Sequence, residues 1–339
     1  MRKFIIAALI FATVLVPVVA ETATVDNPEK IEVLILPKFE NGEMGGDFPG
    51  EAQYYYENYL AGGEEYEIQG GYPGHKLYVK DGVALYVTGM GKVNASMSAT
   101  AVLLDPRFDF SDAYIISTGC GGTATEYTVM GDVFIMSACI DYDLGHHADP
   151  REMTMESETT WFHDGSYDDA SYKLLNQDLV AAVYEMVKDT EIATTERTRN
   201  FMAAAFPGAE WAVRDPEVLL GTTVTGDNYW KGVYDEANAR LMTETYNAPD
   251  PYAMSEMEDA AIAVALDRLG MLDRYIVIRD SVNMDVFMNG ANPEYLWAGV
   301  EDSLASENSV ESADIFATAM ENNYKVGSIV VDAILDGTL

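Results

Sequence analysis

The chain has 339 residues, of which 48% are hydrophobic and 11% aromatic, so a disordered chain is excluded and a sizeable core can form. It carries 56 acidic against 20 basic residues, a formal net charge of −36. Such a surface repels nucleic acid, which proteins bind by neutralising phosphates with Lys and Arg, and it disfavours docking on anionic lipid headgroups.

The N-terminal segment has the pattern of a secretory signal. Arg2 and Lys3 precede an apolar run over residues 4–16, and a stretch of small residues ends at Ala20. We expect cleavage after Ala20 and a periplasmic or secreted protein. A membrane anchor is disfavoured because the apolar run is shorter than the roughly 20 residues that span a bilayer. After cleavage we expect no direct membrane span, a short linker at 21–30 and a single domain over residues 31–339.

Short apolar runs typical of buried strands alternate with segments of helical spacing. Strands are expected at 31–36, 83–87, 113–117, 133–138 and 275–278, and helices at 95–104, 173–187 and 260–269. The alternation predicts an α/β fold, a three-layer α/β/α sandwich with a mixed, mainly parallel central sheet. Polar loops are expected at 140–170 and 190–220.

Two glycine-rich segments follow expected strands, at the edge of the sheet where ligands bind. The first, over residues 88–95, opens a helix, and it is either a ligand cradle or a tight strand–helix turn. The second provides backbone amides for a ligand, and its candidate residues are Thr118, Gly119, Cys120, Gly121 and Gly122. Two such turns at one sheet edge favour a ligand site.

Carboxylates follow the later strands. Three acids within residues 256–259 open an apolar helix, where they either stabilise the helix N-terminus or bind a ligand. Glu258, beside Met257, can accept hydrogen bonds from two vicinal sugar hydroxyls. Asp280 directly follows a buried run, so its pKa can be raised and it can serve as a general acid, unless it is a cap or pairs with Arg279.

Histidine and cysteine give weaker signals. In the segment 141–149, His146 and His147 are adjacent and point to opposite faces of an extended chain, so a loop lining the pocket is favoured over a metal site. We expect no metal and no cofactor. Cys120 and Cys139 could pair in an oxidising compartment, but a disulfide is the less favoured alternative.

The order and wording of these segments resemble the nucleoside phosphorylase/nucleosidase superfamily, and most closely its purine nucleoside permease branch. The branch-specific strings are Leu-Pro-Lys-Phe-Glu at 36–40, Asp-Leu-Gly-His-His-Ala-Asp at 143–149 and Thr-Gly-Asp-Asn-Tyr-Trp at 225–230. The resemblance runs from Ile31 to the C-terminus. It implies one α/β/α domain whose mixed, twisted sheet partly closes into a barrel.

The resemblance also implies roles for individual residues. Met257 and Glu258 would bind the ribose, and Asp280 would protonate the purine at N7. Tyr229, next to Asn228, would stack on the base, and residues 118–122 would form the loop on the base and nucleophile side. In hydrolytic members a Glu shortly after the first strand activates water, and Glu40 falls at that place.

Two departures from the superfamily pattern bear on the reaction. The Gly-Asp-x-x-Arg phosphate loop is replaced by Pro-Lys-Phe-Glu-Asn at 37–41, where a carboxylate repels phosphate although Lys38 could offset its charge. Arg279 stands where a small polar residue is usual.

The sequence therefore favours an exported purine nucleosidase that hydrolyses the N-glycosidic bond of a purine nucleoside. One alternative is a permease-type protein that binds nucleosides for a separate membrane transporter without catalysis. The other is a phosphate-dependent nucleoside phosphorylase. A homo-oligomer is expected by analogy with the superfamily.

Overall fold

The computed structural model describes residues 27–152, 159–286 and 310–339. The predicted signal segment and most of the linker lie outside them. The strands are β1 (Glu29–Lys30), β2 (Val33–Leu36), β3 (Glu64–Glu67), β4 (Lys76–Lys80), β5 (Val83–Tyr86), β6 (Phe108–Asp109), β7 (Tyr114–Thr123), β8 (Val133–Asp141), β9 (His146–His147), β10 (Trp161–Phe162), β11 (Tyr172–Leu174), β12 (Val218–Thr225), β13 (Tyr252–Glu256) and β14 (Tyr275–Met284). The helices are α1 (Gln53–Tyr55), α2 (Lys92–Leu103), α3 (Asp168–Ser171), α4 (Gln177–Val187), α5 (Glu196–Ala205), α6 (Val233–Thr245), α7 (Asp259–Leu269) and α9 (Val310–Leu335).

Strands occur at all five expected places, as β2, β5, β7, β8 and β14. Every residue of β2 and β5 is buried, which explains their continuous apolar sequence. Strands β7 and β14 run on past the expected ends. The glycine-rich residues 118–122 therefore belong to a strand and not to a turn, and Asp280 lies within β14 and not after it.

Helices occur at the three expected places, with two corrections nearby. Helix α4 begins at Gln177 because the side chain of Asn176 accepts hydrogen bonds from the first turn, and the residues just before it form β11. The expected loop at 190–220 contains α5, which Thr195 caps, and the start of β12. The polar sequence of α5 had concealed a helix that buries only one side.

The main sheet has ten strands in the order β11-β8-β12-β13-β7-β2-β5-β4-β3, and β14 pairs with both β7 and β8. The pairs among β7, β14, β8, β12 and β13 thus form a closed ring, a small barrel. The sheet is mixed, as expected. It is not mainly parallel, because antiparallel pairs are as numerous as parallel ones among its described strands.

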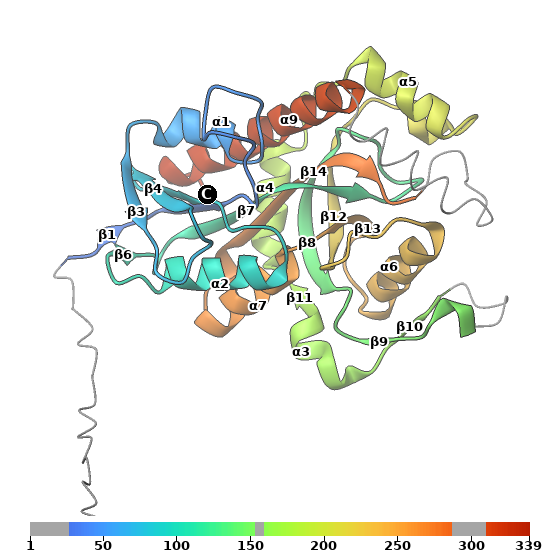
Figure 1. Ribbon diagram of the computed structural model, residues 1–339, viewed down its shortest axis with the longest axis horizontal. Coiled ribbons are helices and arrows are strands. Elements are labelled where there is room, and N and C mark those ends of the chain that lie inside the picture. Colours follow the sequence, from blue (N-terminus) through green and yellow to red (C-terminus); the bar gives the residue numbers. More distant parts are fainter. Residues whose placement is uncertain (1–26, 153–158, 287–309) are drawn as a thin grey trace, which may run out of the picture.

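Helices lie on both sides of the strands in Figure 1, with α1 and α9 on one side and α2 and α7 on the other. Helix α9 packs on β14 and β7, and α7 packs on α2. This confirms an α/β fold with a mixed sheet. Within the described ranges, none of the helices has the length and apolarity that crossing a membrane requires.

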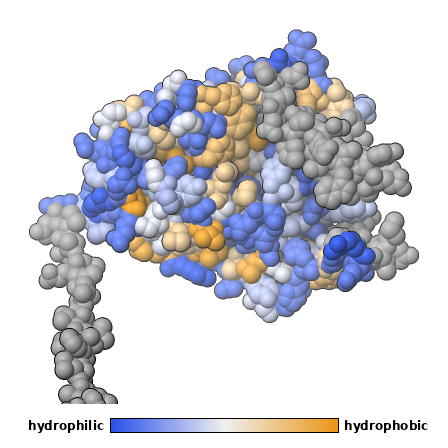
Figure 2. All heavy atoms as spheres, in the orientation of Figure 1, coloured by the Kyte–Doolittle hydropathy of each residue, from blue (hydrophilic) through white to orange (hydrophobic). Residues whose placement is uncertain are grey.

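Helix α2 has apolar side chains on its outer side as well. Val93 and Met97 are 67% and 57% exposed, and Figure 2 shows apolar atoms over this helix. Exposed apolar stripes often mark interaction surfaces. The expected homo-oligomer stays a prediction, and this stripe is apolar surface that such a contact would bury.

Candidate functional site

A buried ionic cluster lies where β13 ends and α7 begins. Arg279 of β14 donates Nε to Asp259 Oδ2 at 2.9 Å, and its Nη2 lies 3.1 Å from both Glu256 Oε2 and Glu258 Oε2. All four side chains are almost completely buried. Burial alone would raise the pKa of Asp259, but the charge of Arg279 holds it below its usual range. Arg279 is thus the central cation of the cluster.

Glu256 and Glu258 differ in how many hydrogen bonds their carboxylates already accept. Glu256 accepts from the hydroxyls of Thr223 and Thr225, from the N–H groups of Glu258 and Asp259, and from Arg279. Within the described part of the chain, Glu258 accepts two bonds, from Gly91 N at 3.0 Å and from Arg279. A carboxylate has about four acceptor positions, so Glu256 is saturated while Glu258 keeps capacity for two ligand hydroxyls.

Burial raises the pKa of Glu258, and the nearby charge of Glu51 raises it further. The positive charges of Arg279 and Lys38 act in the opposite direction. Met257, which precedes Glu258, is partly exposed. The two predicted ribose-binding residues therefore lie together at the end of β13.

Lys38 and Glu51 extend the cluster toward β7. The Lys38 ammonium donates to Leu36 O, Ser117 Oγ and Thr118 O, so all three of its protons are used. Burial lowers the pKa of Lys38. The Glu51 carboxylate accepts from Lys38 N at 2.7 Å and from Cys120 N at 2.9 Å. Glu51 thus connects the segment that follows β2 to the glycine-rich end of β7.

Glu40 has a different role in the structure. Its carboxylate accepts four backbone N–H groups, from Asn41, Gly50, Ala52 and Gln53, and so closes the loop that leads into α1. Burial raises the pKa of Glu40, and these four bonds oppose that rise. All its acceptor positions are filled. The structure does not bring Glu40 into the Arg279 cluster.

Asp280 faces away from that cluster. Its Oδ1 accepts from Asn323 Nδ2 of α9 at 3.1 Å, its buried Oδ2 has no partner among the residues that the structure describes, and Asp280 is 0% exposed. Arg279, the preceding residue, points toward α7, as expected for neighbours on a strand. Burial, followed by the charge of Glu51, raises the pKa of Asp280 well above its ordinary value, which favours the neutral acid.

The glycines of β7 allow other groups to come close. A Cβ at Gly119 would lie 2.5 Å from Glu51 Oε1, and one at Gly121 would lie 2.5 Å from Ser255 O. At Gly122 it would lie 2.7 Å from Asn283 Nδ2. The hydroxyl of Thr118 bonds Asn323 on the α9 side.

Cys120 and Cys139 are free thiols, so the disulfide alternative is not realised. Both residues lie in strands, β7 and β8, that are separated in the barrel by β14 on one side. Burial raises the pKa of both thiols well above the ordinary value. This favours the unreactive thiol form.

Two of the three branch-specific strings, 143–149 and 225–230, contact each other. Asn228 Nδ2 donates to Asp143 Oδ1 at 3.2 Å, and Trp230 stacks on Tyr142 with ring centroids 5.3 Å apart. Tyr229, the predicted stacking residue, is 58% exposed. That the 141–149 segment lines a ligand pocket stays a prediction. In the part of the chain that is described, no group of three or more His, Cys, Asp or Glu residues could hold a metal ion.

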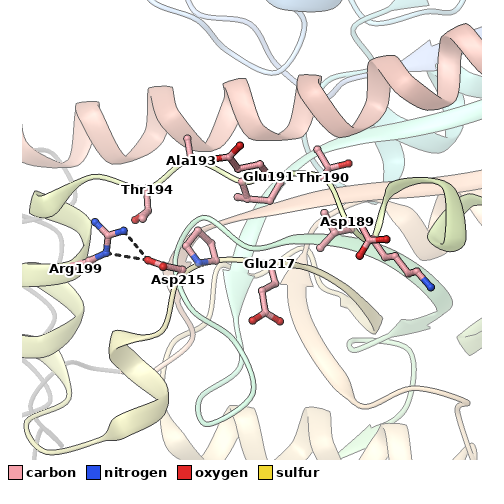
Figure 3. Close-up of a pocket in the computed structure, with 12 residues that line it drawn as sticks. Asp189, Thr190, Glu191, Ala193, Thr194, Arg199, Asp215 and Glu217 are labelled. Atoms are coloured by element: carbon pink, nitrogen blue, oxygen red, sulfur yellow. Dashed lines mark hydrogen bonds and ion pairs between the residues drawn. The ribbon is translucent and has the colours of Figure 1, made fainter.

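A separate cavity of about 490 Å³ lies at the other end of β12 (Figure 3). It is lined by residues 188–194, Arg199 and residues 215–218, and Val218 is the first residue of β12. Arg199 pairs with Asp215 across its wall. None of the predicted site residues lines this cavity.

A family model described as purine nucleoside permease matches residues 30–338. The chain belongs to the purine nucleoside permease family. A probable purine nucleoside permease of Schizosaccharomyces pombe is 25% identical over 288 residues, which cover 78% of this chain and 79% of the yeast protein. A purine nucleoside permease of Candida albicans is 24% identical over 212 residues, which cover 57% of this chain and 52% of that protein.

Solved nucleosidase structures share the fold of this permease family member. The 5′-methylthioadenosine/S-adenosylhomocysteine nucleosidase of Neisseria meningitidis, in complex with methylthio-immucillin-A, has a TM-score of 0.55 at 16% identity and covers 89% of this chain and 99% of its own. The Helicobacter pylori enzyme with butyl-thio-DADMe-Immucillin-A has a TM-score of 0.53 at 14% identity, and the match covers 91% of this chain and 100% of the enzyme's chain. These likenesses show that the chain shares the fold of these nucleosidases.

Three contributors to the site were not predicted from the sequence. The sequence favours Glu40 over Glu51 because Glu40 is nearer to the first expected strand. The start of helix α1 after Glu51 is the signal that could have indicated Glu51. Lys92 was part of the glycine-rich segment but received no role. Asn283 lies beyond the expected end of its strand, opposite Gly122 in the β14–β7 register.

Proposed function

We propose that the site around Glu258 binds a purine nucleoside and that the protein hydrolyses its N-glycosidic bond. The observation that carries this proposal is the pairing of two buried carboxylates with unused acceptor positions, Glu258 and Glu51, each held by backbone N–H groups at the carboxyl ends of strands. The family name and the nucleosidase fold of solved relatives support the same substrate class.

In this proposal Glu258 accepts hydrogen bonds from the two ribose hydroxyls and Met257 covers the sugar. Glu51 takes the role that the sequence assigned to Glu40. It accepts two backbone N–H groups, which leaves about two acceptor positions for a water molecule. A carboxylate that orients and deprotonates water contributes roughly 100- to 10,000-fold to a rate.

On the base side, Tyr229 remains the proposed stacking residue, and residues 118–122 form the floor. Asp280 as the donor to N7 remains a prediction, and its carboxyl is buried and bonded to Asn323 of α9. Asn283 offers a geometric alternative. It is partly exposed and lies over Gly122, and among the described residues its side chain makes one long bond, to Met284 O at 3.4 Å. Its amide can donate a hydrogen bond to a leaving purine.

Charge accounting favours water over phosphate as the nucleophile. In the described part of the chain, site residues contact the cations Lys38, Arg279 and Lys92. These cations already donate to protein carbonyls, hydroxyls and carboxylates. A phosphate would have to displace these partners and approach Glu51 and Glu258, which repel it. The same argument favours a neutral nucleoside over a nucleotide as ligand.

The second candidate is a permease-type binding protein that delivers nucleosides to a separate membrane transporter, and the names of the fungal relatives favour it. Export to the periplasm or the medium is part of either proposal, and the signal segment that motivates it lies outside the described residues.

Incubating the purified protein with inosine, with and without phosphate, tests these alternatives. Release of hypoxanthine without phosphate supports hydrolysis. Release that requires phosphate would replace hydrolysis with phosphorolysis. Tight binding without any release would support delivery.

A further inference from the structure

We propose that Lys92 is a positioning residue that fixes the ribose-binding side of the site relative to its base-binding side. This inference rests on the proposed function, because it concerns how the two halves of a nucleoside are held together. Lys92 is the first residue of α2 and follows Gly91 in the glycine-rich segment. Its side chain is 16% exposed.

The backbone at the start of α2 holds two carboxylates from different strand ends. Gly91 N donates to Glu258 Oε1 at 3.0 Å, and Lys92 N donates to Asp227 Oδ1 at 2.8 Å. The first N–H groups of a helix have no partner within the helix, so they are available for such bonds. Glu258 follows β13 and Asp227 follows β12. One helix end therefore touches both the ribose side and the base side.

The Lys92 side chain adds a second connection. Its ammonium lies 2.8 Å from Asp141 Oδ1 and 2.9 Å from Asp143 Oδ2. Asp143 in turn accepts from Asp227 N at 2.7 Å and from Asn228 Nδ2 at 3.2 Å. The contacts thus run from Lys92 through Asp143 to the segment that carries the predicted stacking residue.

Charge makes the ammonium necessary for this arrangement. The side chains of Asp141 and Asp143 are only 13% and 25% exposed, so two carboxylates lie close together in a poorly solvated place. Without a cation they repel each other, which weakens the hold of Asp143 on Asp227 N and Asn228 Nδ2 and loosens the 227–229 segment. The backbone bonds of Gly91 and Lys92 do not depend on the ammonium, so the helix and Glu258 stay in place.

A nucleoside bridges both sides, whereas a free purine contacts only one. Misalignment of the two sides therefore weakens nucleoside binding and leaves purine binding nearly unchanged. Loss of general folding would weaken both ligands alike. The comparison of the two ligands separates a positioning role from a structural one.

The experiment compares the wild-type protein with Lys92→Met, Lys92→Arg and Lys188→Met. Lys188 forms an exposed pair with Glu185 and serves as the matched control. The readouts are the KM and kcat for inosine, or its Kd by calorimetry if the protein binds without cleaving, and the Ki or Kd of hypoxanthine. We expect Lys92→Met to weaken inosine at least about tenfold, with hypoxanthine within about twofold of wild type. Lys92→Arg should recover most of the loss, because a guanidinium can also bond two carboxylates.

Equal weakening of inosine and hypoxanthine, or no change in either, would overturn the positioning role. The recovery of inosine binding in Lys92→Arg must also exceed the loss of inosine binding in Lys188→Met. A smaller recovery would count against the positioning role as well. If the wild-type protein itself bound no inosine, the proposed function would fail and this inference with it. If the wild type bound inosine and Lys92→Met bound it equally well, the inference alone would fail.

Discussion

Arg279 and Asp280 are consecutive residues of β14, yet their side chains lie in different buried networks. Arg279 bonds the carboxylates of Glu258 and Asp259 beside α7, and Asp280 bonds Asn323 of α9. The alternation of side chains along a strand produces this separation. The proposed ribose site and the Asp280 carboxyl therefore lie on opposite sides of one strand.

Asp280→Asn should retain inosine turnover within about threefold of wild type, because an amide resembles the neutral acid that burial favours at this position. The rate of hypoxanthine release by the purified variant measures this. A loss of more than about 100-fold, the usual contribution of a general acid, would instead support the role predicted from the sequence.

Arg279→Met should destabilise the protein by about 3–5 kcal/mol, because it leaves three buried carboxylates without their shared cation. Urea unfolding at pH 7 measures the free energy of unfolding. The matched control is Arg197→Met, which removes an exposed pair with Asp314 and should cost less than about 1 kcal/mol. Similar losses in both variants would contradict the importance of the Arg279 cluster.

Asp285 should make stability fall as the pH rises. Burial raises its pKa to about 7, and its oxygens accept from Tyr252 and Ser255. An unfolded Asp titrates near about 3.9, so between roughly pH 4 and 7 the folded protein keeps a proton that the unfolded chain releases. The stabilising contribution of Asp285 to the free energy of unfolding is fully present below pH 4. It is lost at about 1.4 kcal/mol per pH unit as the pH rises, and the loss levels off above pH 7.

Asp285→Asn removes this titration while keeping the shape of the side chain. The free energy of unfolding of wild type minus that of the variant should decrease by about 2–3 kcal/mol between pH 5 and pH 7. Urea unfolding at the two pH values gives the difference. Parallel pH profiles of the two proteins would show that Asp285 does not titrate in this range.

The sequence predicted the strands and helices best where burial is simplest. The continuous apolar runs of β2 and β5 are enough to predict two buried strands. The closing of the barrel was expected only from the family resemblance. Strand β14 was expected to stop at Ile278 because the next residues are polar. Arg279, Asp280 and Ser281 are nevertheless buried in the sheet, and Asn323 bonds one of the two carboxyl oxygens of Asp280.

The water-activating candidate shows why the site was harder to predict than the fold. Both Glu40 and Glu51 follow the first strand, and composition cannot show which carboxylate closes the loop before α1. The conformation of residues 41–53 decides this, since it turns four N–H groups toward Glu40. The number of free acceptor positions on each carboxylate depends on where these N–H donors lie, and the sequence does not show this.

The most direct test of the account compares Glu51→Gln with Glu40→Gln in the hydrolysis of inosine without phosphate. An amide oxygen cannot deprotonate water, so Glu51→Gln should lower the kcat of the folded protein at least about 100-fold. Glu40→Gln should reduce the melting temperature, because an amide cannot accept all four backbone N–H groups, while the folded fraction stays within about tenfold of wild-type kcat. The reverse pattern, with full turnover in Glu51→Gln and none in folded Glu40→Gln, would contradict the account.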